Sequence, residues 1–265
     1  MRVSMEMIVC IKQVVTGSQV RFDSKTHRIL RSREHSRINP FDLDALALAK
    51  ELKKKYSAKV TALSMGPEIS EDVLWEALAS GADRAVLLCD PLFASSDTLA
   101  TSYVLGMGIR KIGTYDLILC GKRTSDSGTG QVGPQLAEEL DIPHVTGVER
   151  VEIVDRLLQI ERTSDGFRER MELAIPALLT VAPVQRASLP SLVEIEDAFG
   201  SNQIERWTLQ DLKADPSRVG PTGSHTWVET LTPLTRQKAC SFIEGDPRQQ
   251  AKSLMDQLIR RGSFF

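Results

Sequence analysis

Hydrophobic positions in the first half of the chain alternate between short apolar runs and segments with helical spacing. The runs are short, bounded by turn residues, and lie at residues 7–11, 58–65, 84–89 and 115–119. Such runs predict buried strands. Residues 40–54 and 71–79 carry apolar side chains at the spacing of one helix face, and Asp97 is placed to cap a third helix. This alternation predicts an α/β fold with a mostly parallel sheet and helices on both faces.

The pattern changes after Pro143. Segments 148–154, 157–162 and 167–173 are separated by turn residues and predict an antiparallel hairpin insertion. The apolar run 177–181 predicts a strand that returns to the main sheet. Residues 20–22 and 28–30 flank the turn sequence 23–26, so they predict an earlier hairpin.

From about Pro183 the chain is rich in proline, glycine, serine and polar residues, with few apolar runs. We therefore expect an α/β domain at 1–183 and an extended C-terminal arm at 184–265. The arm ends in a helix near 246–261 with one apolar stripe, formed by Ala251, Leu254, Met255, Leu258 and Ile259. That stripe packs either on its own domain or on another subunit. We favour another subunit, because about sixty residues separate the helix from the sheet.

Charge and composition exclude several classes of protein. The net charge of −2, with acidic and basic residues interspersed, gives no electrostatic footprint for nucleic acid. No apolar run approaches the ~18 residues of a membrane span, and no signal-peptide pattern opens the chain, so we expect a cytoplasmic protein. The four cysteines and four histidines are scattered, which favours reduced thiols and no metal site.

The most informative segment is the loop sequence at 120–134, which follows a strand and precedes a helical pattern. Free N–H groups and the helix dipole at such a place favour an anion. Gly128, Gly130 and Gly133 allow close backbone approach, and Ser127 and Thr129 offer hydroxyl groups. The segment is neither a P-loop nor a GxGxxG dinucleotide motif. The residues alone leave open a phosphate site or a flexible surface loop.

Six segments in register resemble the β subunit of electron transfer flavoproteins, from Val9 to about Leu192. They are Val9–Val14, Asn39–Phe41, Met65–Pro67, Ala77–Asp83, Asp97–Thr101, and Gly121–Lys122 with Gln131–Gly133. The resemblance implies a heterodimer with an α subunit and an FAD near the interface. It also implies a buried nucleotide in this chain, AMP in the commoner type or a second FAD in the electron-bifurcating type.

The resemblance also implies which residues hold the nucleotide. The adenine and ribose are expected against the ends of three early segments, and the phosphate at the loop that precedes a helix. The implied positions are Cys10, Ile11, Lys12, Asn39, Met65, Gly66, Gly121, Thr129, Gly130, Gln131, Val132 and Gly133. Asp97, Thr98 and Thr101 begin another helix and either donate to phosphates or simply form a helix cap and an exposed turn.

Two further positions carry over from the family. Phe41 matches the aromatic residue that approaches the flavin of the partner chain; the alternative is an apolar residue that packs the start of its own helix. Leu189, within Arg186–Pro190, matches the leucine of a recognition loop that inserts into an acyl-CoA dehydrogenase. Acidic Glu194, Glu196 and Asp197 follow where relatives are often lysine-rich, which suggests a different partner surface.

The sequence resembles both types of carrier. Asp97–Tyr103 and Gln131–Pro134 are similar to the bifurcating type, in which NADH is the donor. Val14–Gly17 lacks the Pro-Asp-Thr of that type, and Gly128 stands where it has aspartate. We favour single-electron transfer through one interface FAD, from acyl-CoA dehydrogenase-type flavoenzymes to a downstream acceptor. No general acid, base or nucleophile is evident, so we expect a carrier rather than an enzyme. The competing class is a stand-alone adenine-nucleotide sensor module.

Overall fold

The computed structural model describes residues 5–15, 21–22, 29–30, 36–183, 190–201, 204–229 and 240–262. The chain divides into two compact units, Met1–Val228 and Glu229–Phe265. The first unit contains a nine-stranded sheet with the order β11-β10-β9-β12-β8-β1-β6-β7-β13. In chain order its strands are β1 (Glu6–Cys10), β6 (Lys59–Met65), β7 (Arg84–Leu88), β8 (Leu117–Gly121), β9 (His144–Val154), β10 (Leu157–Ser164), β11 (Phe167–Ala174), β12 (Ala177–Val181) and β13 (Ile204–Trp207).

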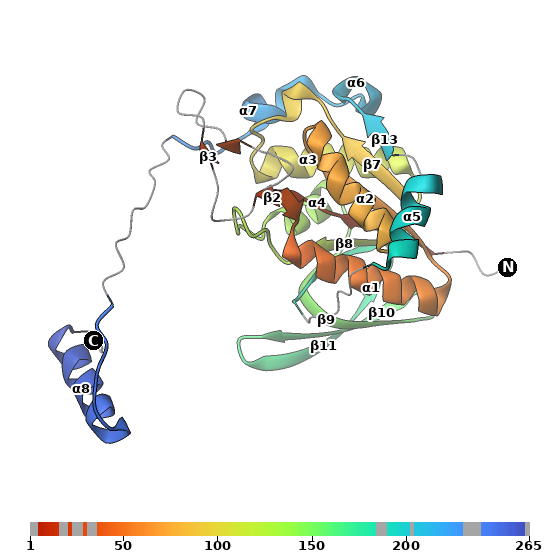
Figure 1. Ribbon diagram of the computed structural model, residues 1–265. Helices are drawn as coiled ribbons and strands as arrows, with labels where there is room; N and C mark the ends of the chain where they lie inside the picture. The colour runs from red at the N-terminus through yellow and green to blue at the C-terminus, as the bar shows by residue number, and fades with distance from the viewer. Residues whose placement is uncertain are drawn as a thin grey trace. The chain divides into compact units, whose positions relative to one another are not determined.

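The sheet is mostly parallel, which confirms the expected fold class. Strands β9, β12, β8, β1, β6, β7 and β13 run parallel, and β9, β10 and β11 form the expected antiparallel insertion at one edge (Figure 1). The early hairpin is also present, because β3 (Arg21–Phe22) pairs antiparallel with β4 (Ile29–Leu30). A second small pair joins β2 (Gln13–Val15) to β5 (Ser36–Ile38).

Helices cover both faces of the sheet, because alternate residues of each strand point to opposite sides. In β1, Met7 and Val9 pack with α1, α2 and α5, whereas Ile8 and Cys10 pack with α3 and α4. The helices are α1 (Pro40–Tyr56), α2 (Glu71–Ala79), α3 (Thr98–Ile112), α4 (Val132–Leu140), α5 (Leu192–Ser201), α6 (Leu209–Leu212) and α7 (Gly220–Gly223). Short 3₁₀ turns lie at η2 (Glu68–Ser70), η3 (Pro91–Phe93) and η4 (Pro216–Arg218).

The first unit reaches further along the chain than the expected boundary at residue 183. Strand β13 pairs parallel with β7 at the edge of the sheet, and α5 packs on α2 through stacked rings of Trp75 and Phe199, 4.7 Å apart. Trp207, Leu212 and Val219 are buried in the core. The polar composition of this segment did not predict these contacts. A few well-spaced apolar residues are enough to attach a short strand and a helix to an existing core.

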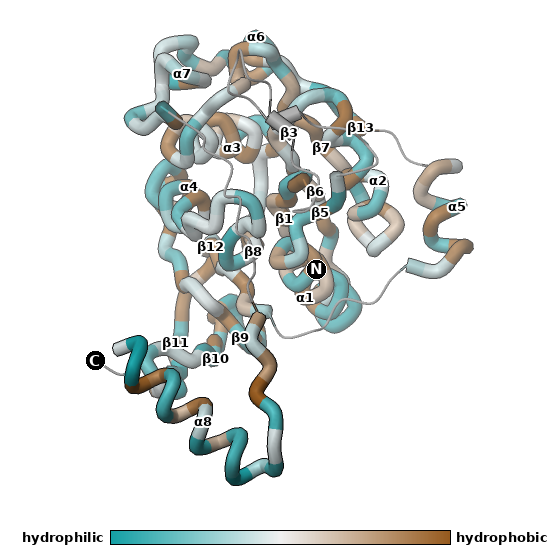
Figure 2. The backbone as a smooth tube through the Cα atoms, turned by 60° about the vertical axis from the view of Figure 1, so that its left-hand side comes forward, coloured by the Kyte–Doolittle hydropathy of each residue, from teal (hydrophilic) through white to brown (hydrophobic). Residues whose placement is uncertain are grey.

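The second unit holds the terminal helix α8 (Pro247–Arg260). Asp246 caps it by accepting hydrogen bonds from the N–H groups of Arg248 and Gln249. Along its length hydrophobic residues alternate with hydrophilic ones (Figure 2). Leu254, Met255 and Ile259, three members of the predicted apolar stripe, are 47, 47 and 58% exposed, so this face is uncovered in the single chain.

Candidate functional site

The carboxyl ends of the parallel strands meet at one edge of the sheet. There β1, β6, β8 and β12 end at Cys10, Met65, Gly121 and Val181. Ligands of open α/β sheets lie outside this edge. The predicted cofactor positions lie at these strand ends, in the loops that follow them, or at the helix starts that those loops lead into, and Asp97, Thr98 and Thr101 follow β7 (Arg84–Leu88) in the same way. The topology therefore brings them to one edge.

The loop between β8 and α4 has a backbone that glycine makes possible. Gly128 and Gly130 have φ angles of +67° and +66°, the left-handed region that side chains disfavour. The Gly128 N–H donates to the Thr124 carbonyl at 3.0 Å, and the hydroxyls of Thr124 and Ser127 are 2.8 Å apart. These hydrogen bonds give the segment a defined turn, and the phosphate site itself stays a prediction.

Gly133, at the start of α4, lies against the sheet, and its approach to a phosphate stays a prediction. A Cβ there would lie 2.5 Å from Cγ2 of Thr180 in β12. Glycine therefore lets the first turn of α4 pack directly on the sheet. Val132 is partly exposed beside it, and Gln131 is the N-cap residue of the helix.

A cavity of about 290 Å³ lies against this loop. Two cations, three threonines and the two glycines of the turn line it. They are Lys122, Arg123, Thr129, Thr146, Thr180, Gly128 and Gly130. In the described parts of the chain, neither Lys122 nor Arg123 pairs with a carboxylate. Cations, hydroxyls and loop N–H groups are the kinds of donor that bind phosphate-like anions in proteins. Sequence reasoning found the loop but missed Lys122, Arg123, Thr146 and Thr180 as lining residues.

Arg123 also covers an aromatic ring. Its guanidinium carbon lies 5.1 Å from the centroid of the Phe41 ring, a cation–π contact. Phe41, near the start of α1, is only partly buried. The ring of Phe41, the aromatic residue expected to face the flavin, therefore lies beside Arg123 at the rim of the cavity. Phe41 also lies in the first turn of α1, so its position fits the alternative role of packing the start of its own helix as well.

The side chains of Lys12 and Asn39 hold the loop in place. Nζ of Lys12 lies 3.0 and 2.8 Å from the two carboxylate oxygens of Asp126. Asn39 donates to the Arg123 carbonyl at 2.9 Å and accepts from the Ser125 N–H at 3.1 Å. Burial opposes ionisation of Asp126, but the Lys12 ammonium holds the pKa of Asp126 below its usual value. Both predicted nucleotide contacts are thus engaged with protein groups.

Asp42 is a buried carboxyl that the sequence analysis did not single out. It accepts from the Lys12 N–H at 2.7 Å and from the Asn39 side-chain amide at 2.8 Å. A Cβ at Gly121 would overlap its Oδ1, so that glycine makes room for the carboxyl. Burial raises the pKa of Asp42 to about 7, against the opposing effect of these hydrogen bonds. The only sequence signal was its place in the first turn of α1, three residues after Asn39.

Cys10 and Ile11 are buried, at 8 and 4% exposure, so only their backbone is available to a ligand at this edge. Cys10 and Cys120 are register partners in β1 and β8. A hydrogen bond with the Cys10 thiol, together with burial, raises the pKa of Cys120 well above its usual value. The Cys120 thiol is therefore a neutral packing group.

Met65 and Gly66, after β6, are partly exposed at the same edge. The Gly66 N–H donates to the Leu88 carbonyl at 3.1 Å, and a Cβ at Gly66 would overlap the Ser70 hydroxyl. That hydroxyl donates to Oε1 of Gln13 at 3.2 Å. The turn after β6 is thus fixed against β2, which follows β1 in the chain.

Asp97 caps helix α3, which is one of the two roles predicted for it. Its carboxylate accepts from the Ala100 N–H at 3.0 Å and from the N–H groups of His225 and Thr226 at 2.9 and 3.0 Å. Burial opposes ionisation, but these donors hold the pKa of Asp97 below its usual value. Its own N–H donates to the Ser224 hydroxyl at 2.8 Å. Asp97 therefore fastens the end of the first unit to the start of α3.

Thr98 and Thr101 follow in the first turn of α3. The Thr98 hydroxyl donates to Oε1 of Gln131 at 3.0 Å, and the Thr101 N–H donates to the Asp97 carbonyl. The Thr98 hydroxyl thus links the two helix starts at the site, and a ligand contact by Thr101 stays a prediction.

Leu189 lies outside the described residues, as do its neighbours 184–188. The next described residues form the start of α5, where Leu192 and Val193 are 84 and 66% exposed. Glu194 caps this helix by accepting from the Ser191 N–H at 2.8 Å and pairs with Lys50 at 2.9 Å. The Ser191 and Lys50 donors lower the pKa of Glu194 to about 2. Glu194 thus forms a surface ion pair with Lys50, and its side chain stays 43% exposed.

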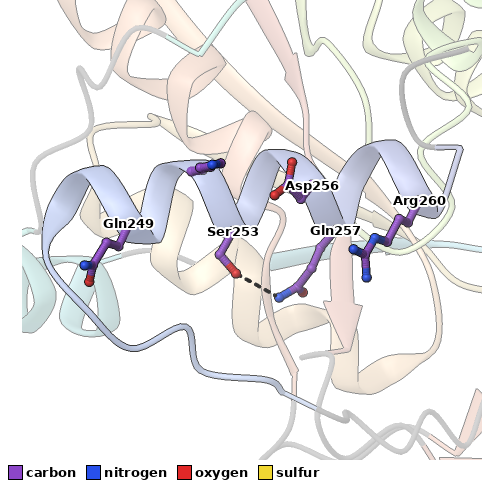
Figure 3. Close-up of a pocket in the computed structure, with 6 residues that line it drawn as sticks. Gln249, Ser253, Asp256, Gln257 and Arg260 are labelled. Atoms are coloured by element: carbon purple, nitrogen blue, oxygen red, sulfur yellow. Dashed lines mark hydrogen bonds between the residues drawn. The ribbon is translucent and has the colours of Figure 1, made fainter.

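A second hollow lies along α8 and is lined only by polar residues of that helix (Figure 3). Gln249, Ser253 and Gln257 follow one another along it, with the Gln257 amide 3.5 Å from the Ser253 hydroxyl. A surface made by one helix alone is a solvated face, so it is no ligand site. Across the described residues, no helix is long and apolar enough to cross a membrane, and no three potential metal ligands come together.

Comparison with known proteins connects this site to a family. Residues 26–212 match the electron transfer flavoprotein domain. The chain is 38% identical to the electron transfer flavoprotein subunit beta of Thermoanaerobacterium thermosaccharolyticum, over 97% of this chain and 99% of the relative. It is 40% identical to the same subunit of Clostridium acetobutylicum, over 85% of this chain and 86% of the relative.

A differently named relative is similar along the same length. Protein FixA of Azorhizobium caulinodans is 36% identical, over 97% of this chain and 95% of the relative. The domain match covers the strands from β5 to β13 and the loop at 122–131, and it begins after β1. The chain belongs to the electron transfer flavoprotein family, as a member of its β-subunit branch.

Proposed function

We propose that this chain is one half of a heterodimeric electron carrier. Its partner is an α subunit, and an FAD lies near the interface between the two. Electrons enter from acyl-CoA dehydrogenase-type flavoenzymes and leave to a downstream acceptor. The names of the relatives support an electron transfer flavoprotein β subunit. The bound flavin supplies the redox chemistry, and this chain binds and orients.

The cavity beside the loop carries the proposal. Lys122, Arg123 and the turn at Gly128–Gly130 provide positive charge and backbone donors without a competing carboxylate in the cavity lining. These groups fit the phosphate of an adenine nucleotide. AMP and the diphosphate of a second FAD both suit this donor set, and both remain candidates. We assign the adenosine to the strand ends near Met65 and Gly66.

The contact with the shared flavin is assigned to Phe41. Its ring is partly exposed and one face is covered by Arg123, which leaves an edge for a planar partner. The partner subunit is expected to cover the apolar stripe of α8, whose exposed Leu254, Met255 and Ile259 otherwise face water. Leu189 is proposed as the anchor for the dehydrogenase.

Electron bifurcation with a second FAD and NADH is the second candidate. Two segments resemble that type, Asp97–Tyr103 and Gln131–Pro134. The hydrogen bond from Thr98 to Gln131 joins them at one place. A longer diphosphate would extend along both helix starts. A stand-alone nucleotide sensor is the third candidate, but it gives no reason for an uncovered apolar face on α8.

Nucleotide counting tests these candidates. The chain is co-expressed with its α subunit, the heterodimer is purified, and released FAD and AMP are counted per pair. A yellow heterodimer with one FAD and one AMP supports the single-flavin carrier, and two FAD support bifurcation. A colourless, stable monomer that binds ATP reversibly rejects both carriers in favour of the sensor.

A further inference from the structure

Asn39 has no polar group left for a ligand. Its side chain is fully buried, and its amide donates to Oδ1 of Asp42 and to the Arg123 carbonyl, at 2.8 and 2.9 Å. Its carbonyl oxygen accepts from the Ser125 N–H at 3.1 Å. Each of these contacts is to the protein, and two are to the loop that borders the cavity. The residue therefore acts on the loop from behind rather than on a nucleotide.

Asp42 fixes the other end of this arrangement. Its Oδ2 accepts from the Lys12 N–H at 2.7 Å, just beyond β1, and a backbone hydrogen bond with Gly121 reaches it from the end of β8. The carboxyl is 5% exposed. One buried group thus joins the ends of two central strands to Asn39, and through Asn39 to residues 123 and 125.

We propose that Asp42 and Asn39 are positioning residues that set the loop for anion binding, and that their hold depends on the charge of Asp42. This inference rests on the proposed nucleotide site. It goes beyond that site because neither side chain contacts the ligand. The same network fixes the backbone beside Phe41 and the Arg123 that covers its ring, so it orients both the anion site and the flavin-facing aromatic.

Hydrogen-bond counting explains the dependence on charge. Ionised Asp42 offers two oxygens that only accept, and three donors face them: the Lys12 N–H, the Asn39 amide and the Gly121 backbone. Protonation turns one of these oxygens into an uncharged hydroxyl, which is a weaker acceptor, so the hydrogen bond that this oxygen accepts is weakened. Burial, which raises the pKa of Asp42 to about 7, places that change near neutral pH.

The charges around Asp42 are few. The Lys12 ammonium favours its ionised form but is itself paired with Asp126 in the loop. The Cys120 thiol at the end of β8 is neutral. Asp44 lies two residues along α1, and the Arg123 guanidinium is turned toward Phe41.

The test compares AMP and FAD affinity across about pH 5.5–8.5 in the full chain, purified with its α subunit and stripped of nucleotide. Wild type should bind about three- to tenfold more weakly below pH 7, the effect of one hydrogen bond. Asp42→Asn should show that weak affinity at every pH, because a carboxamide mimics the neutral acid. Asn39→Ala should bind weakly at every pH as well.

Asp116→Asn is the matched control. Asp116 is buried like Asp42, at 8% exposure. It accepts a 3.0 Å hydrogen bond from the N–H of Glu6, at the start of β1, which lies at the opposite edge of the sheet. It should keep the wild-type pH profile even if it loses stability. Titration of the ligand's own phosphate cancels, because all variants are compared with the same ligand.

The outcomes separate the two proposals. Wild type that binds neither AMP nor FAD at any pH overturns the nucleotide site itself. Wild type that binds, with Asp42→Asn showing the same pH profile, overturns only the positioning role. A profile flattened equally by Asp116→Asn also overturns it, since general destabilisation would then be the cause.

Discussion

The hydroxyl of Thr98 donates a 3.0 Å hydrogen bond to Oε1 of Gln131, so the start of α3 is tied to the start of α4. These two helices begin on loops from β7 and β8, which are separated in the sheet by β6 and β1. A single side-chain contact therefore spans the mouth of the proposed nucleotide site. Any ligand that lies along both helix starts must lie against this pair.

Removing that hydroxyl should weaken nucleotide binding. Thr98→Val keeps the shape of the side chain but leaves Gln131 without its donor. We expect a two- to tenfold loss, about 0.5–1.5 kcal/mol, measured by calorimetry on the stripped heterodimer. Thr98→Ser retains the hydroxyl and should bind like wild type. Equal weakening by the serine variant would show that methyl packing, and not the bond, matters.

Gly130→Val should abolish the turn. The φ of +66° is strained for valine, and a Cβ there would lie 3.3 Å from the Lys122 carbonyl. Nucleotide recovered from the purified protein should fall below half of wild type. Gly166→Val is the control, because Gly166 has a φ of +80° in open space at a distant hairpin. Full nucleotide occupancy in Gly130→Val would place the phosphate elsewhere.

Lys122 and Arg123 should contribute charge to binding. Replacement of either by alanine removes a charge-assisted hydrogen bond, so affinity should drop about ten- to a hundredfold, and the salt dependence of binding should become shallower. Lys54→Ala, an exposed cation near the end of α1, should change neither quantity. Titrations at low and high salt give both readouts. An unchanged affinity in both variants would remove the cavity from the nucleotide site.

Asp42 should also leave a signature in fold stability. Because its folded pKa of about 7 lies above the unfolded value of 3.8, the stability that its neutral form contributes is present below 3.8 and is lost as pH rises through about 7. Between pH 5 and 8, the stability of Asp42→Asn relative to wild type should therefore rise by about 2–3 kcal/mol. Urea unfolding at both pH values measures it. A constant difference would mean an unshifted carboxyl.

The exposed face of α8 should be needed for assembly. Leu254→Asp places a charge among Met255 and Ile259, so recovery of the heterodimer should fall while thermal unfolding of the main unit stays unchanged. Gln257→Asp carries the same charge on the polar face and should assemble normally. Pull-down through a tagged α subunit measures recovery. Equal assembly of both variants would mean that this stripe packs within its own chain.

The central sheet was readable from sequence because its strands are continuous apolar runs and its helices begin with clear caps. Asp97 caps α3 and Pro40 opens α1 as expected. Strand β13 and helix α5 were not readable, because Ile204–Trp207 has one buried residue and gains stability only from the existing edge of β7. Short segments of that kind are defined by the surface they join rather than by their own pattern.

The predicted site residues lie at one edge of the sheet, as the order of strands and loops predicts, but their contacts could be predicted only in part. Glycines and hydroxyls marked the loop, since turn chemistry is local. Nothing local distinguishes an asparagine that contacts a ligand from one, like Asn39, whose amide is used by residues more than eighty positions away. Thr146 and Thr180 were missed for the same reason. They lie on β9 and β12, and only the folded sheet brings them to Lys122.

The contact of Gly133 with Thr180 limits how this protein can change its ligand. With no room for even a methyl group, the first turn of α4 stands at a fixed height above β12. Selection for a larger or smaller cofactor cannot proceed by altering that floor. Variation in ligand choice among homologues should therefore accumulate in the loop between β8 and α4, where side chains border open space.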